Sequence, residues 1–152
     1  MNRPDPLPAA LKAKGTLGEL ATLQVRHVDA AKGYETGRDM AKPEIEPLLA
    51  ELAEMHQAMA DQAARILADH GGEPDSDGSW LSWVHRGVMT ARGLFDGVGE
   101  DALGGLIDGE RRVLDQIKTV LGQDLWSDEE RRILIGQRDR IEATIARLRH
   151  GA

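Results

Sequence analysis

Apolar residues recur at spacings of three and four in four long stretches of the chain, the pattern of amphipathic helices. The stretches cover about residues 16–40, 45–70, 99–121 and 127–148. A shorter helical pattern spans about residues 79–95, between the second and third stretches. Strand signals are weak because β-branched and aromatic residues are sparse, so we expect an all-α fold.

Local signals mark where the predicted helices begin and end. Pro43 stops the first helix, and the run from Gly71 to Pro74 combines a C-cap glycine with a proline that cannot continue the second. Ser127 and Glu130 have the spacing of a capping box at the start of the fourth helix. We expect residues 1–15 to form a disordered, Pro-rich lead and residues 16–150 to form one domain.

The lengths of the connections predict the topology. The first and last connections are only a few residues long, so each flanking pair of helices should form an antiparallel hairpin. The middle connection has about 28 residues, far more than the usual 2 to 8 between bundle helices. Such a segment can travel the length of the bundle, which predicts a ferritin-like crossover with the short extra helix in it. A plain up-and-down bundle with an inserted surface helix is the alternative.

Each long helix carries one polar residue near the middle of its apolar stripe. Midpoints lie at one level in an antiparallel bundle, whichever way each helix runs, so these side chains should meet in one layer. The four residues are His27, His56, Glu110 and Gln137.

Composition excludes several classes of function. A net charge of −7 argues against nucleic acid or an anionic membrane surface as a partner, because both attract clusters of Lys and Arg. The absence of Cys excludes disulfides, thiolate metal sites and cysteine nucleophiles. No stretch approaches the roughly 20 apolar residues of a membrane helix, and residues 1–15 lack an apolar signal core. The cytoplasm is therefore the expected location.

Several short motifs, in this order and spacing, resemble a bacterial ferritin-like family described as a four-helix-bundle domain of unknown function. They are Lys32-Gly33-Tyr34, Gly71-Gly72-Glu73-Pro74, His85-Arg86-Gly87 and Gly109-Glu110. The resemblance covers about residues 17–148 and implies a fold, without an activity or substrate. Many members place a Glu before the Lys-Gly-Tyr motif, where this chain has Ala31, so a ligand on the first helix is missing.

The polar layer suggests a metal site, which the chemistry only partly supports. A di-iron site in such a bundle takes one Glu from each of two helices and a Glu-x-x-His motif from each of the others. This chain has no Glu-x-x-His, so His27, His56, Glu110 and Gln137 would hold at most one ion, such as zinc or iron. A hydrogen-bonded layer that fixes helix register, without a cofactor, is the favoured interpretation. A third interpretation is that the helices are rotated so that one or two of these side chains reach solvent. The Tyr34 hydroxyl either joins the hydrogen-bond network or reaches the surface.

Two classes of function follow from these patterns. The first is a non-catalytic bundle that acts through its surface, as a homo-oligomer or with another protein; an exposed apolar stripe with Ala21, Val25 and Val28 would be its sign. The second is a metal-binding protein with a redox or stress-related role. His85 and Arg86 could also line a ligand pocket, although docking of the connection is the simpler interpretation. We expect no enzymatic activity.

Overall fold

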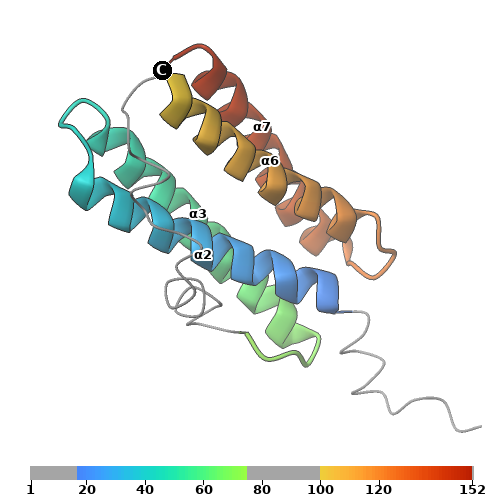
Figure 1. The fold of residues 1–152 in the computed structure, drawn as a ribbon. Helices are drawn as coiled ribbons and strands as arrows, with labels where there is room; N and C mark the ends of the chain where they lie inside the picture. The colour runs from blue at the N-terminus through green and yellow to red at the C-terminus, as the bar shows by residue number, and fades with distance from the viewer. Residues whose placement is uncertain (1–16, 75–99, 152) are drawn as a thin grey trace, which may run out of the picture.

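Four α-helices form the part of the molecule that the computed structural model describes, residues 17–74 and 100–151 (Figure 1). They are α2 (Gly18–Met40), α3 (Glu46–Asp69), α6 (Glu100–Leu121) and α7 (Asp128–Arg149). The prediction of an all-helical bundle is confirmed, since these residues include no strand. The predicted disordered lead, the short helix over residues 79–95, and His85 and Arg86 lie outside the described residues.

The end of α3 shows how local sequence sets a helix boundary. Gly71 has a φ of 84°, a left-handed conformation that a residue with a side chain adopts only with strain. The N–H of Gly72 donates to the carbonyl of Leu67, and the N–H of Gly71 donates to that of Ala68. This pair of bonds is a Schellman motif, which satisfies the last carbonyls of α3 and confirms the predicted glycine stop.

The start of α7 confirms the predicted capping box. The Ser127 hydroxyl accepts from the Glu130 N–H at 3.1 Å, and the Glu130 carboxylate accepts from the Ser127 N–H at 2.9 Å. Both bonds satisfy backbone groups that a helix leaves without internal partners. Three acidic residues in this first turn also complement the positive end of the helix dipole.

The Ser127→Ala substitution should lower the free energy of unfolding by about 1 kcal/mol, because the Glu130 N–H loses its acceptor. Urea unfolding followed by circular dichroism measures the loss. Ser127→Asp is the matched control, since a carboxylate also accepts at this position and should leave stability nearly unchanged. Equal losses in the two variants would show that the cap does not stabilise α7.

The start of α2 is held by another helix rather than by its own cap. Leu17 precedes the first helical residue and makes no side-chain cap hydrogen bond. The amide nitrogen of Gln116, near the end of α6, donates at 2.8 Å to both the carbonyl and the carboxylate of Glu19. These contacts place the first turn of α2 beside the last turns of α6, so the two helices run antiparallel.

Contacts between helix ends fix the rest of the topology. Arg147 at the end of α7 donates to Glu51 near the start of α3, while His70 after α3 contacts Glu130 at the start of α7. The helices α3 and α7 are therefore antiparallel. Because α7 is also antiparallel to α6, the helices α3 and α6 run in the same direction, as the colours in Figure 1 show.

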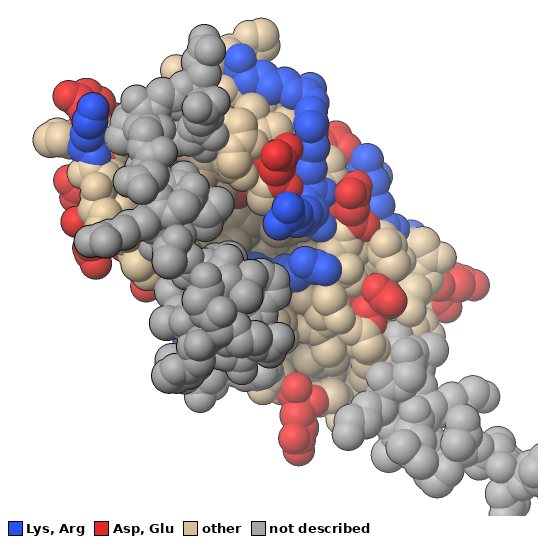
Figure 2. Space-filling view, viewed as in Figure 1, with Lys and Arg blue, Asp and Glu red and all other residues tan. Residues whose placement is uncertain are grey.

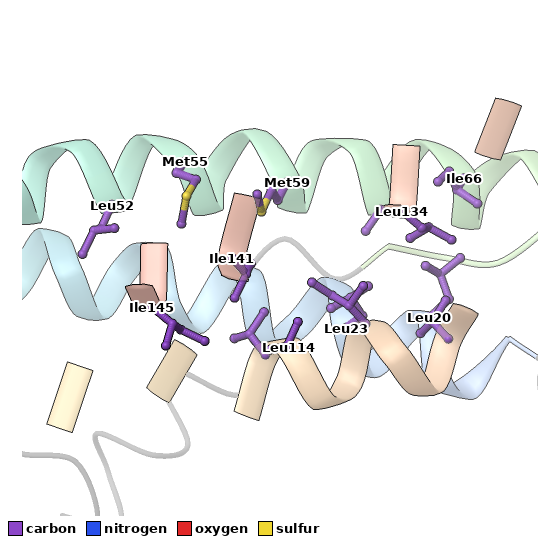
Figure 3. Close-up of a cluster of buried hydrophobic side chains, with 14 of the residues drawn as sticks. Leu20, Leu23, Leu52, Met55, Met59, Ile66, Leu114, Leu134, Ile141 and Ile145 are labelled. Atoms are coloured by element: carbon purple, nitrogen blue, oxygen red, sulfur yellow. The ribbon is translucent and has the colours of Figure 1, made fainter. Parts of the chain in front are cut away.

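The core is apolar toward both ends of the bundle. Figure 3 shows Leu20, Ile66 and Leu134 near one end and Leu52 and Ile145 toward the other. These residues come from α2, α3 and α7, and all are buried. Each such side chain contributes roughly 1.5 to 3 kcal/mol by leaving water, which identifies this packing as the main source of bundle stability.

The surface of the described residues carries few large apolar side chains. Only Met40 and Leu125 are exposed among them, and Val28 is buried with 5% of its surface accessible. An exposed stripe through Ala21, Val25 and Val28, which would have been the sign of a bundle that acts through its surface, is not present, because Val28 is buried and Ala21 and Val25 are only partly accessible. On the face in Figure 2, Lys and Arg atoms over α6 and α7 lie among Asp and Glu atoms.

A helix that spans a membrane needs a long apolar stretch of roughly 20 residues. Each of the four described helices is too polar or too short in its apolar part to cross a bilayer.

Candidate functional site

The four polar residues predicted at the helix midpoints do meet in the centre of the bundle. His27 comes from α2, His56 from α3, Glu110 from α6 and Gln137 from α7. Each has at most 2% of its surface accessible, so none reaches solvent. The interpretation in which helix rotation exposes one or two of them is therefore wrong. We call this set the polar layer.

Three hydrogen bonds join the polar layer across the bundle. The Nδ1 atoms of His27 and His56 lie 2.9 Å apart. The Nε2 of His27 lies 2.9 Å from the Oε1 of Gln137, and the Nε2 of His56 lies 2.8 Å from the Oε1 of Glu110. Every ring nitrogen of the two histidines is thus engaged within the layer.

Tyr34 and Gln62 extend the polar layer at its two ends. The Tyr34 hydroxyl donates to the Glu110 Oε1 at 2.5 Å, and its ring stacks on His56 with centroids 5.6 Å apart. At the other end, the Gln137 Nε2 donates to the Met59 carbonyl at 3.2 Å and to the Gln62 side-chain oxygen at 3.0 Å. Tyr34 therefore joins the network instead of reaching the surface, one of the two outcomes expected for it.

Gln62 was not among the predicted site residues. It follows Met59 by three residues and so lies on a neighbouring part of the same face of α3. A polar residue one turn from a core position was the available signal. Its side chain is only partly buried, which makes it the outer end of the network.

Burial fixes the protonation of two members of the network. The pKa of His27 falls from its ordinary 6.5 to about 3, first because burial penalises its charged form and then because of the neighbouring His56. The hydrogen bond with Gln137 opposes this shift. The pKa of Tyr34 rises because of burial and of the charge and hydrogen bond of Glu110. Both side chains are neutral at neutral pH.

One carboxyl oxygen of the polar layer has no hydrogen-bond partner among the described residues. It is the Oε2 of Glu110, which is buried. A buried acceptor without a partner costs about 1 to 3 kcal/mol, so this oxygen is a weak point of the layer.

The geometry of the layer can be compared with that of a zinc site. Two imidazole nitrogens on one tetrahedral zinc lie about 3.4 Å apart, since each Zn–N bond is about 2.05 Å. The two Nδ1 atoms are closer and point at each other. Among the described residues, no three His, Asp or Glu side chains converge as metal ligands do. Coordination by the layer would thus require a His ring to turn, and the predicted metal role of its four residues stays a prediction.

A groove lies elsewhere on the described surface, between the end of α6 and α7. Its lining includes Lys118, Arg131 and Arg138 but no member of the polar layer. Arg131 already donates to the carbonyls of Leu121 and Gln123 and so caps the end of α6. The groove therefore gives no access to the buried polar groups.

A second polar cluster at one end of the bundle was not predicted. The Nε2 of His70 lies 3.0 Å from Glu130, and its ring meets Trp126 edge-on at 5.3 Å. Burial raises the pKa of the Glu130 carboxyl, but hydrogen bonds from the Ser127 backbone and from His70 outweigh it, and the pKa lies below 4.5. The cluster connects the end of α3 to the start of α7, which is a structural role.

The Tyr34→Phe substitution should lower the free energy of unfolding by about 1 to 2 kcal/mol, because Glu110 loses a donor inside the core. The ring itself is kept, so its packing should not change. Chemical denaturation at neutral pH measures the loss. Thr119→Val is the control: its hydroxyl is exposed and donates to the Asp115 carbonyl, and its removal should change stability by less than about 0.5 kcal/mol. Similar effects in both variants would contradict a structural role for the Tyr34 hydroxyl.

No curated protein and no solved structure matches this chain significantly. A family model described as "Domain of unknown function (DUF2383)" matches residues 16–123, well over half of the chain. The matched region includes α2, α3 and α6, and with them three members of the polar layer. The resemblance to a family of unknown function is confirmed to this extent: the chain belongs to the DUF2383 family.

Proposed function

We propose that this protein is a non-catalytic, ferritin-like four-helix bundle whose polar layer is structural and which acts through its outer surface. The observation that carries the proposal is that all four ring nitrogens of His27 and His56 have partners within the layer. Groups satisfied in this way hold helices in register and are not available to a substrate. What the bundle offers to other molecules is its surface, through self-association or contact with another protein.

The arrangement of the helices supports the ferritin-like class. Ferritin-like bundles join two antiparallel hairpins by one long crossover, which makes the second and third helices parallel. Here α3 and α6 run in the same direction, and the connection between Asp69 and Glu100 is long enough for such a crossover. The polar layer also occupies the level at which this class holds its metal ligands.

A metal-binding bundle is the second candidate, because the Glu110 Oε2 is buried without a hydrogen-bond partner in the part of the chain that the structure describes. A single divalent ion such as zinc or iron, held by His27, His56, Glu110 and Gln137, would satisfy this oxygen. The donor set of two imidazoles, a carboxylate and an amide oxygen suits zinc better than a di-iron centre.

Elemental analysis of untagged protein, purified without chelator, separates the two candidates. Thermal unfolding with and without Zn²⁺, Fe²⁺ and Mn²⁺ accompanies it, and sedimentation equilibrium reports self-association. The structural proposal expects no stoichiometric metal and unchanged unfolding temperatures. Near-stoichiometric metal that is lost in Glu110→Gln and kept in the surface variant His150→Asn would establish the second candidate instead. A monomer at high concentration would leave another protein as the partner.

A further inference from the structure

A continuous chain of hydrogen bonds crosses all four described helices. It runs from Tyr34 through Glu110, His56, His27 and Gln137 and ends at Gln62. Each link joins atoms 2.5 to 3.0 Å apart. The direction of the links between His56 and Gln62 can be worked out from the Gln137 end, because the Met59 carbonyl there can only accept.

Gln137 fixes the direction at one end. Its Nε2 lies 3.2 Å from the Met59 carbonyl, which can only accept a hydrogen bond. The amide nitrogen must therefore face α3, and the amide oxygen must face His27. Since an amide oxygen only accepts, the Nε2 of His27 carries a proton and donates.

The two histidines pass this direction on. The His27 ring is fully buried and contacts His56 and Gln137, neither of which is a carboxylate that could balance a positive charge, so His27 is neutral; with its proton on Nε2, its Nδ1 is an acceptor. The facing Nδ1 of His56 must then carry a proton and donate across the 2.9 Å contact. The opposite direction would place two donors or two acceptors against each other at one of the links.

The link between His56 and Glu110 contains one further proton. The Nδ1 of His56 is already protonated, so the proton near its Nε2 belongs either to that nitrogen or to the Glu110 Oε1, 2.8 Å away. The layer has zero net charge in both cases, either as an imidazolium and a carboxylate or as two neutral groups. Tyr34 donates to the same oxygen in both.

We infer that the polar layer is a hydrogen-bond chain with fixed histidine tautomers that runs in one direction from His56 to Gln62, in which His56 and Glu110 share a single proton and the layer stays uncharged. This inference rests on the structural role proposed above and specifies how the layer sets helix register. Hydrogen bonds that point in one sense polarise each other and strengthen the chain. Each helix contributes at least one member, so sliding one helix breaks links to at least two others.

Nitrogen-15 NMR of histidine-labelled protein at neutral pH tests the hydrogen-bond chain directly, because unprotonated and protonated ring nitrogens have widely separated chemical shifts. We expect a protonated Nε2 and a bare Nδ1 in His27, and a protonated Nδ1 in His56. His27→Asn and His56→Asn assign the signals. A protonated Nδ1 in His27, or a bare Nδ1 in His56, would overturn the inference.

Two further variants test the role of Gln137 as the fixed end. Gln62→Ala removes the outer partner but keeps the Met59 carbonyl, so the His27 shifts should not change. Gln137→Met removes the acceptor, so the His27 nitrogens should exchange or reverse their order; unchanged shifts in the folded variant would contradict the assigned direction. Metal content of the same sample separates the proposals, since opposite tautomers without metal overturn the chain alone, whereas stoichiometric metal overturns the structural role.

Discussion

Gln137→Glu should destabilise the bundle by about 4 kcal/mol at pH 7, although it changes only one group. The Gln137 amide nitrogen donates to the Met59 carbonyl and the Gln62 side-chain oxygen, and a carboxylate oxygen there would face two acceptors. The new carboxyl can occupy this position only when protonated. Holding it protonated at pH 7, against an ordinary pKa of about 4.3, costs about 1.4 kcal/mol for each pH unit, or about 4 kcal/mol.

Urea unfolding of Gln137→Glu and of the wild type, compared at pH 7 and again at pH 5, measures this penalty. The difference between the two proteins should shrink to about 1 kcal/mol at pH 5, because the unfolded chain is then also partly protonated at this position. Gln137→Met is the matched control, since it loses the same hydrogen bonds without adding a titrating group, and its penalty should not depend on pH. A Glu variant as stable as the wild type at pH 7 would mean that the layer holds a positive charge, which would favour a bound metal ion.

The level of the polar layer could be predicted from the sequence because a helix midpoint does not depend on chain direction. His27, His56, Glu110 and Gln137 each interrupt an apolar stripe, and burial of the stripe forces all four inward. The capping box at Ser127 was equally predictable, since it depends only on residues three positions apart. Local spacing and burial therefore account for the helices and for the membership of the layer.

The order of partners within the layer could not be predicted. Sequence spacing gives the height of a residue on its helix, but the rotation of the helix decides which atoms come within hydrogen-bond distance. The contact between the two Nδ1 atoms of His27 and His56 depends on this rotation and on ring orientation. The role of Gln62 does as well, because its position at the edge of the stripe is compatible with either solvent or core.

Contacts beyond the helix ends were missed for a different reason. His70 follows the last residue of α3 and Trp126 lies in the connection before α7, so neither belongs to an apolar stripe. Their meeting with Glu130 depends on how the two hairpins are placed against each other. The burial of Val28 likewise depends on which parts of the chain cover α2, and helical periodicity carries no information about that.

Acid should destabilise this protein over an unusually high pH range, because the pKa of His27 is about 3 in the folded state against an ordinary 6.5. Between these values the unfolded chain binds a proton that the folded protein excludes, so stability is full above pH 6.5 and falls as the pH decreases toward 3. A shift of this size corresponds to a loss of about 5 kcal/mol across the whole window, at up to about 1.4 kcal/mol for each pH unit. Urea unfolding at half-unit intervals from pH 8 to about pH 4 measures the slope.

The groups around His27 make this loss specific to one residue. His56 of α3 and Gln137 of α7 contact its ring, and Glu110 of α6 lies beyond His56, so a proton on the His27 Nδ1 would face the donor of His56. In His27→Asn, whose side-chain oxygen can accept from His56, the slope between pH 6.5 and 4.5 should largely disappear. The exposed His150→Asn should keep it.

Carboxyls with lowered pKa values, such as Glu130, add their own loss of stability only below about pH 4.5, because a carboxyl with a lowered pKa stabilises the fold above its unfolded pKa. If the free energy of unfolding of His27→Asn falls with pH as steeply as that of the wild type, burial does not prevent His27 from binding a proton. The assignment of its Nδ1 as a fixed acceptor would then be wrong.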